Sequence, residues 1–141
     1  MSRYMGLDLG DKTIGVALSD PFFMTAQPLL TIKRTKAKED IRKISDIIKE
    51  KQVEKIIIGL PLNMNNTLGP QGQKVLSFVD LLKKEIDLEI IYEDERLTTV
   101  QSDRVLSSMD VRKENRKKYI DKIAAAFILQ SFLDRRKHGQ D

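Results

Sequence analysis

The sequence lacks cysteine and tryptophan and contains a single histidine, His138, close to its end. Without cysteine the chain forms no disulfide and offers neither a thiolate nucleophile nor a sulfur ligand for zinc or an iron–sulfur cluster. A histidine at the end of the chain is poorly placed for a Ser-His triad or a metal site, which hold imidazole inside a framework. An enzyme of this composition must therefore use carboxylates, hydroxyls, lysine, arginine or a metal bound through oxygen.

Long apolar runs are also missing. The uncharged stretch 21–32 has twelve residues and two prolines, and the longest one, 56–73, has eighteen residues that include two prolines, three glycines and three asparagines. About twenty apolar residues are needed to span a bilayer. The first eight residues lack the apolar core of a signal peptide. We therefore expect a cytoplasmic protein that does not enter a membrane.

The length and composition are those of one ordinary domain, with 141 residues, 40% hydrophobic and 33% charged. We find no repeat or linker and expect one domain over residues 1–141. The net charge is +4, but residues 112–137 alone hold nine basic and three acidic side chains, a local excess of six. The carboxyl-terminal part is thus expected to be basic in an otherwise nearly neutral protein.

Hydrophobic patterning predicts elements in the order β-β-β-α-β-α-β-α-α. Strands are expected at 3–9, 13–19, 21–32, 53–59 and 88–92, helices around 41–48, 75–86, 98–108 and 119–136, and a polar, basic loop at 109–118. Three strands that form a meander, followed by βα units, indicate a mixed five-stranded sheet with helices on both faces.

Asp8 lies at the end of the first expected strand, between Gly6 and Gly10. An aspartate in a turn is the simpler interpretation, since Asp-x-Gly is common in hairpins. However, the two glycines would let a phosphate or a metal ion approach the backbone closely. Lys12 follows in the same turn, where its ammonium group could meet a phosphate charge.

Three acids, Glu93, Asp94 and Glu95, follow the last expected strand. In open α/β sheets ligands bind at the carboxyl ends of the strands. A solvated acidic loop is the alternative interpretation. The residues that come next, Arg96 and Thr98, favour a site, because hydroxyls at a helix amino terminus are ready phosphate contacts.

Asp121 shares a face of the last expected helix with Ala124, Ala125, Ile128 and Phe132. A carboxylate on an apolar stripe must be paired, protonated or bound to a metal, because burying it bare costs several kcal/mol. The alternative is an aspartate near the helix start that is stabilised by the helix dipole. We favour a functional role.

Together these acids describe a site for a hard cation, and carboxylate oxygens suit Mg²⁺ or Mn²⁺. Two such ions about 4 Å apart can activate a water and stabilise the leaving oxygen in phosphodiester cleavage. The basic segments 33–43 and 112–122, the latter with Lys117 and Lys118, could hold a polyanion. For either segment taken singly, a solvated charged face is the alternative.

Four motifs, in order over residues 3–134, closely resemble the YqgF (RuvX) family. They are Asp8-x-Gly10-x-Lys12-x-Ile14-Gly15-Val16-Ala17, Gly59-Leu60-Pro61-Leu62-Asn63, Asp94-Glu95-Arg96-Leu97-Thr98-Thr99 and Ile120-Asp121-x-x-Ala124-Ala125. The departures are small: Asn65-Asn66 stands where many members have Asp-Gly, and Thr13 where an arginine is common.

The resemblance implies an RNase H-like fold, related to Holliday junction resolvases, and a nuclease that matures the 5′ end of precursor 16S ribosomal RNA. Asp8, Glu95 and Asp121 match the acidic positions and would be the catalytic metal ligands, with Asp94 an alternative to Glu95. Lys12, Asn63, Arg96 and Thr98 match positions that would face nucleic acid. Ribosomal precursor particles are the expected partners.

Two other functions stay open. A resolvase of four-way DNA junctions would make two symmetric nicks and should be a two-fold dimer, so the chain is expected to be a monomer or a homodimer. A non-catalytic nucleic-acid-binding module is less favoured, because such a module would be expected to lose one of the three acids.

Overall fold

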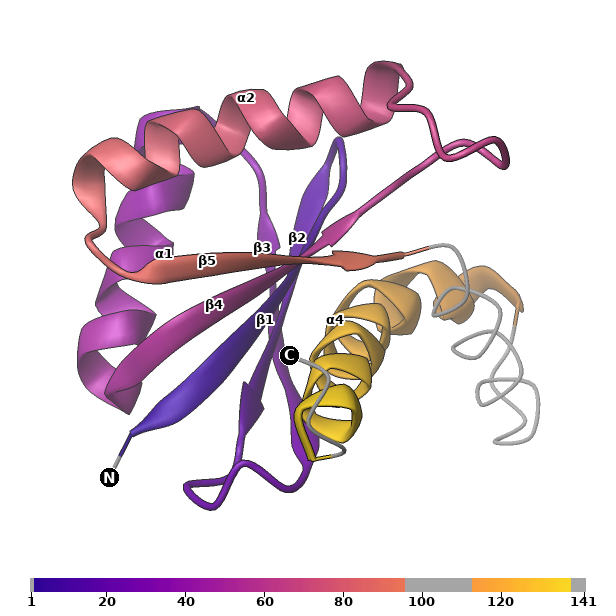
Figure 1. Ribbon diagram of the computed structural model, residues 1–141. Coiled ribbons are helices and arrows are strands. Elements are labelled where there is room, and N and C mark those ends of the chain that lie inside the picture. Colours follow the sequence, from indigo (N-terminus) through magenta and orange to yellow (C-terminus); the bar gives the residue numbers. More distant parts are fainter. Residues whose placement is uncertain (1, 96–112, 138–141) are drawn as a thin grey trace.

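The computed structural model describes residues 2–95 and 113–137, with side chains from Lys122 onward in the second range (Figure 1). Its elements are β1 Arg3–Leu9, β2 Thr13–Ser19, β3 Ala26–Lys33, α1 Ala37–Lys51, β4 Val53–Leu60, α2 Pro70–Glu85, β5 Glu89–Asp94 and α4 Lys113–Lys137.

The strands form one five-stranded sheet in the order β3-β2-β1-β4-β5. β1 pairs antiparallel with β2, and β2 with β3, whereas β4 runs parallel to both β1 and β5. The expected mixed sheet of three antiparallel and two parallel strands is confirmed. β1 is the central strand, so Asp8 near its carboxyl end lies at the middle of the sheet edge where β4 and β5 also end.

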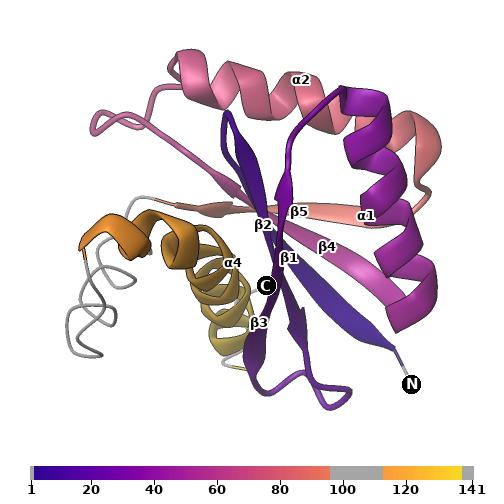
Figure 2. The ribbon, with the colours of Figure 1, turned by 180° about the vertical axis from the view of Figure 1, so that it is seen from behind.

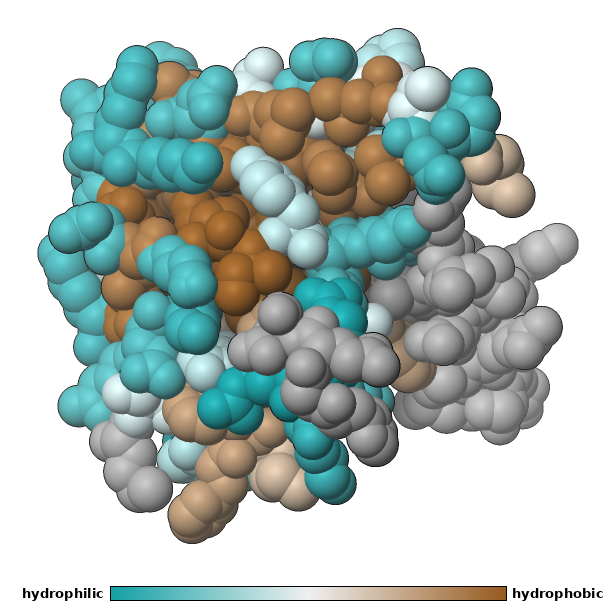
Figure 3. Space-filling model, viewed as in Figure 1, coloured by the Kyte–Doolittle hydropathy of each residue, from teal (hydrophilic) through white to brown (hydrophobic). Residues whose placement is uncertain are grey.

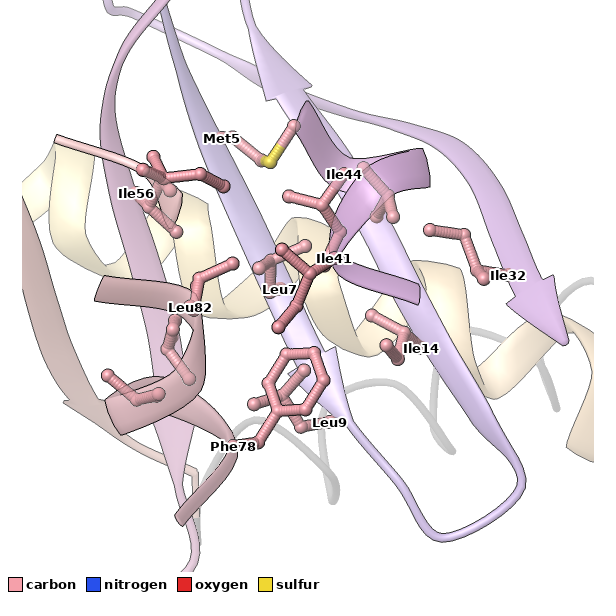
Figure 4. Packing of buried hydrophobic residues seen from close by; sticks show 14 of the residues in the cluster. Met5, Leu7, Leu9, Ile14, Ile32, Ile41, Ile44, Ile56, Phe78 and Leu82 are labelled. Atoms are coloured by element: carbon pink, nitrogen blue, oxygen red, sulfur yellow. The ribbon is translucent and has the colours of Figure 1, made fainter. Parts of the chain in front are cut away.

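Helices cover both faces of the sheet, as expected. α1 and α2 lie on one face and α4 lies on the other, as the two opposite views show (Figures 1 and 2). The larger core fills the space between α1, α2 and the sheet, where Leu7, Ile14 and Ile56 meet Ile44 and Leu82 (Figure 4).

The smaller core lies under α4, where Ala125, Ile128 and Phe132 pack against Tyr4 and Ile57. Strand side chains alternate between the two faces. Since Tyr4 faces α4, Asp8, four residues along the same strand, faces α4 as well.

Gly6 determines how closely α4 approaches β1. A Cβ at this position would lie 2.7 Å from the backbone oxygen of Ala125 and 2.8 Å from the Cβ of Leu129. Helix α4 therefore occupies the space that a side chain at position 6 would need. Of the two glycines beside Asp8, Gly6 serves helix packing rather than the approach of a ligand, contrary to the expectation from the sequence.

The third strand begins at Ala26, five residues later than expected, because Asp20 organises the preceding residues into a turn. Its carboxylate accepts hydrogen bonds from the backbone N–H groups of Met24 at 2.7 Å, Thr25 at 2.8 Å and Phe22 at 3.1 Å. These bonds, that of Thr25 foremost, hold the pKa of Asp20 below its ordinary value.

Helix α4 begins at Lys113, so the loop expected at 109–118 is wrong for residues 113–118. These six residues include lysine, glutamate and arginine, which are good helix formers, and no glycine or proline. The polarity of these residues excludes them from the core, but it does not prevent them from forming a helix. The helix expected at 98–108 lies outside the described residues.

No helix among the described residues is long and apolar enough to cross a membrane. Apolar surface is nevertheless visible between α2 and β5, rimmed by hydrophilic side chains (Figure 3). β5 lies at the end of the sheet order, and its half-buried Ile90 and Tyr92 pack against the larger core on this side.

A candidate active site at the carboxyl edge of the sheet

Asp8 and Glu95 line the same small cavity, of about 250 Å³, at the carboxyl edge of the sheet. Among the residues that the structure describes, the rest of its lining is uncharged and comprises Leu9, Gly10, Pro61, Leu62 and Gln71. Asp8 comes from the central strand β1. Glu95 directly follows β5, and its backbone N–H donates to the oxygen of Leu60 at 3.2 Å, which continues the β4–β5 ladder by one step.

Gly59 on β4 makes room for the carboxyl group of Glu95. A Cβ on Gly59 would lie 3.3 Å from the carboxyl carbon of Glu95 and 2.5 Å from Cδ1 of Ile128. Gly59 follows Ile58, the β4 partner of Leu7, so it sits between the strand of Asp8 and the strand that leads to Glu95. The missing side chain thus opens the surface between the two acids.

The three acids at the end of β5 have different surroundings. Glu93 is buried, with 3% of its surface exposed, and its carboxylate accepts hydrogen bonds from Ser131 at 2.8 Å and from Arg135 of α4. Glu93 therefore connects α4 to β5 through these two bonds. Asp94 is exposed and, by strand alternation, faces away from α4. Of the two alternatives left open by the sequence, Glu95 is the one that shares a cavity with Asp8.

Asp121 lies on α4, one turn before Ala124 and Ala125, which are buried against the sheet. Only the backbone of Asp121 is described. Among the residues with described side chains, no group of three or more histidines, aspartates or glutamates could hold a metal ion. The structure therefore brings two of the three expected ligands together and leaves the third to proposal.

Two carboxylates in one cavity are suited to a divalent cation. Asp8 and Glu95 are both half-buried, and like charges that share a site repel one another unless a cation neutralises them. Carboxylate oxygens are the ligands that Mg²⁺ and Mn²⁺ prefer. The residues present thus fit the metal that the resemblance implies.

The residues expected to face nucleic acid lie partly within the described chain. Lys12 is exposed in the turn between β1 and β2, and Asn63 is exposed in the loop that leads to α2. The Asn63 side-chain amide donates to the hydroxyl of Thr67 at 3.0 Å. Lys117 and Lys118 belong to α4, where only the backbone is described, and Arg96 and Thr98 lie outside the described residues.

Gln71 lines the cavity, although the sequence did not single it out. The sequence feature that could have indicated Gln71 is its position in the first turn of α2, directly after Pro70 at the helix start. A lone glutamine in such a position is too common to indicate a site without the tertiary structure.

A family model described as "RuvX: Holliday junction resolvase" matches residues 2–135. The chain belongs to the RuvX family. Its relatives include a protein of Clostridium tetani that is 56% identical over 132 residues, which cover 94% of this chain and 96% of the relative. A protein of Thermoanaerobacter pseudethanolicus is 56% identical over 137 residues, covering 96% and 99%. Both carry the name "Putative pre-16S rRNA nuclease".

Solved structures place this RuvX member in the RNase H-like fold. T. thermophilus RuvC in complex with a Holliday junction substrate aligns with a TM-score of 0.61 at 15% identity, covering 98% of this chain and 97% of that one. The yeast mitochondrial Holliday junction resolvase Ydc2 aligns with a TM-score of 0.56 at 13% identity, covering 99% and 82%. At these identities the likeness concerns the fold alone.

Proposed function

We propose that this RuvX protein is a metal-dependent nuclease that hydrolyses phosphodiester bonds and processes the 5′ end of precursor 16S rRNA in the cytoplasm. The observation that carries the proposal is the shared cavity of Asp8 and Glu95, two carboxylates from separate strands in a chain without cysteine. The name of the relatives that are 56% identical supports precursor 16S rRNA as the substrate.

Asp8, Glu95 and Asp121 would hold Mg²⁺ or Mn²⁺, as a pair of ions, through carboxylate oxygens. When bound, such ions activate a water and stabilise the charge on the leaving oxygen. The chain's part is to fix the carboxylates: the β1 ladder holds Asp8, and the bond to Leu60 holds the backbone of Glu95. Gly59 leaves the space in which the Glu95 carboxyl lies.

Cations around this edge would bind the substrate phosphates. Lys12 is exposed in the turn that follows Asp8, and its ammonium group would attract a phosphate beside the cavity. Asn63, Arg96 and Thr98 would donate hydrogen bonds to the same strand. Lys117 and Lys118 would bind phosphates further along the substrate, and this contribution to the affinity would weaken as the salt concentration rises.

A resolvase of four-way DNA junctions is the second candidate, and the description of the matching family model favours it. A resolvase needs two sites that face one junction, which calls for a two-fold dimer. The substrate and the pattern of cuts therefore separate the two functions.

The test compares wild type with Asp8→Asn and the control Asp46→Asn, with Mn²⁺ or Mg²⁺, on precursor 16S rRNA fragments and a four-way DNA junction. Asp46 is exposed on α1, which covers the face of the sheet opposite to the one that Asp8 faces. We expect wild type and Asp46→Asn to cleave the RNA and Asp8→Asn to bind it without cleavage and with an unchanged melting temperature.

Other outcomes point elsewhere. Paired nicks in the junction, with the RNA intact, would favour the resolvase. Cleavage of neither substrate by wild type would favour a binding module. An Asp8→Asn protein that melts well below wild type would mean that Asp8 is structural, and the proposed site would be wrong.

A further inference from the structure

We propose that Arg34 is a positioning residue, which holds the β1–β2 turn as a wall of the cavity and is itself oriented by the buried carboxylate of Asp40. The inference rests on the proposed nuclease function, because it assigns Arg34 an effect on that site. Arg34 follows β3 and belongs to none of the motifs that carry the family resemblance.

Arg34 binds both ends of the turn made by residues 10–12. Its Nη1 donates to the backbone oxygen of Gly10 at 2.6 Å, and its backbone N–H donates to the oxygen of Lys12 at 2.9 Å. The ladder between β1 and β2 ends at the pair Leu9 and Ile14. The backbone N–H of Gly10 donates to the oxygen of Thr13 at 2.9 Å and closes the turn, and Arg34 holds the carbonyl groups of Gly10 and Lys12 from the end of β3.

Asp40 orients the guanidinium group of Arg34. Its carboxylate is only 1% exposed, lies 3.5 Å from Nε of Arg34 and accepts a hydrogen bond from the backbone N–H of Thr35 at 3.1 Å. The ring of Phe78 lies under the guanidinium, with its centroid 5.0 Å from Cζ. A carboxylate this deeply buried is costly unless it is paired, and Arg34 is the cation that pairs with it.

The turn matters because it bounds the cavity. Gly10 lines the cavity beside Asp8 and Glu95, and Lys12 emerges from the same turn. If the turn moves, the wall and the proposed phosphate contact move with it. Misplacement by about 1 Å at a reacting centre can cost on the order of a hundredfold in rate.

Arg3 provides a matched control at the other end of the same hairpin. Its Nη1 donates to the backbone oxygen of Ser19 at 2.9 Å, so Arg3→Ala also removes one guanidinium–carbonyl bond from β1 and β2. It does so at the sheet edge opposite the cavity. A merely structural role of Arg34 would make the two alanine variants alike.

The experiment measures kcat and KM for RNA cleavage, hydrogen exchange of the turn amides and the affinity for Mn²⁺ alone in Arg34→Ala, Asp40→Asn and Arg3→Ala. For Arg34→Ala we expect kcat to fall by about tenfold or more, with KM little changed, faster exchange in residues 10–13 and weaker Mn²⁺ binding. Asp40→Asn should move the same quantities in the same direction by less. Arg3→Ala should change only the stability.

Three results would overturn the inference. One is a kcat for Arg34→Ala equal to that of Arg3→Ala. Another is a raised KM at unchanged kcat, with a log–log salt slope shallower by about one, which would make Arg34 a direct phosphate contact. The third is unchanged exchange in the turn. If Arg34→Ala does not fold, Arg34→Lys replaces it, since a lysine cannot bond Gly10 and Asp40 together as the guanidinium fork does.

Failure of the proposed function is recognised separately, by a wild-type protein that cleaves neither RNA nor DNA. In that event the exchange rates and the Mn²⁺ affinity still decide whether Arg34 holds the turn, since neither depends on cleavage.

Discussion

The same substitution, glutamate to glutamine, is expected to have opposite effects at two positions that are two residues apart. Glu93 is buried under α4 and accepts hydrogen bonds from Ser131 and Arg135. Glu95 is half-buried beside Asp8 in the candidate site. Glu93→Gln should therefore lower the free energy of unfolding and leave RNA cleavage unchanged. Glu95→Gln should abolish cleavage and leave the free energy of unfolding nearly unchanged.

The size of the Glu93 effect follows from its two donors. Hydrogen bonds to a charged group contribute about 1.5–3 kcal/mol each. Glutamine can keep both contacts, with its oxygen toward Arg135 and its NH₂ group donating to the Ser131 hydroxyl, but it removes the charge, so each bond falls to about 0.5–1.5 kcal/mol. The Arg135 side chain is 34% exposed, and water offsets part of that loss. We expect the free energy of unfolding to fall by about 2 kcal/mol and Tm by about 6 °C.

The Glu95 effect on stability should be small. Removing one of two carboxylates that share a cavity also removes their mutual repulsion, so we expect a change within about 0.5 kcal/mol. Stability is measured by urea and thermal unfolding, followed by circular dichroism, and activity by the RNA cleavage assay below the melting transition. Equal destabilisation by the two variants, or loss of cleavage in folded Glu93→Gln, would refute these assignments.

Two further predictions concern packing and pH. Gly6→Ala should lower the free energy of unfolding by about 3 kcal/mol, the upper end for overpacking, because the backbone oxygen of Ala125 cannot move aside. Gly10→Ala, whose Cβ would lie 3.0 Å from the backbone oxygen of Thr13, should lower it by less in the same urea titration. The pKa of Asp20 is lowered from 3.8 by backbone hydrogen bonds, so its stabilisation is present above that pH and disappears as the pH falls through the lower folded value. The difference in unfolding free energy between wild type and Asp20→Asn should therefore shrink on acidification, and a constant difference would show that this carboxylate does not stabilise the turn.

Much of the fold was predictable from local patterns. The run Ile56-Ile57-Ile58 is apolar on both faces of a strand and became the buried strand β4. The stripe of Ala124, Ala125 and Ile128 became the buried face of α4. The start of α4 differs from the prediction, because a polar segment without glycine or proline can continue a helix as well as form a loop.

The choice among Glu93, Asp94 and Glu95 could not come from the sequence. β5 carries apolar residues on both faces, so its period does not show which acid faces which way. That choice depends on α4, whose Ser131 and Arg135 bond Glu93 from 38 and 42 residues further along the chain. Strand alternation then turns Glu95 to the same face as Asp8.

The sequence by itself determined the strand order along the chain, the mixed sheet and the residue types that any chemistry must use, because these follow from periodicity and composition. Only the tertiary structure decided which acids share a cavity, that Gly6 serves helix packing and that Arg34 binds the turn at Gly10. Each of these depends on contacts between segments far apart in the chain, and local patterns do not determine such contacts.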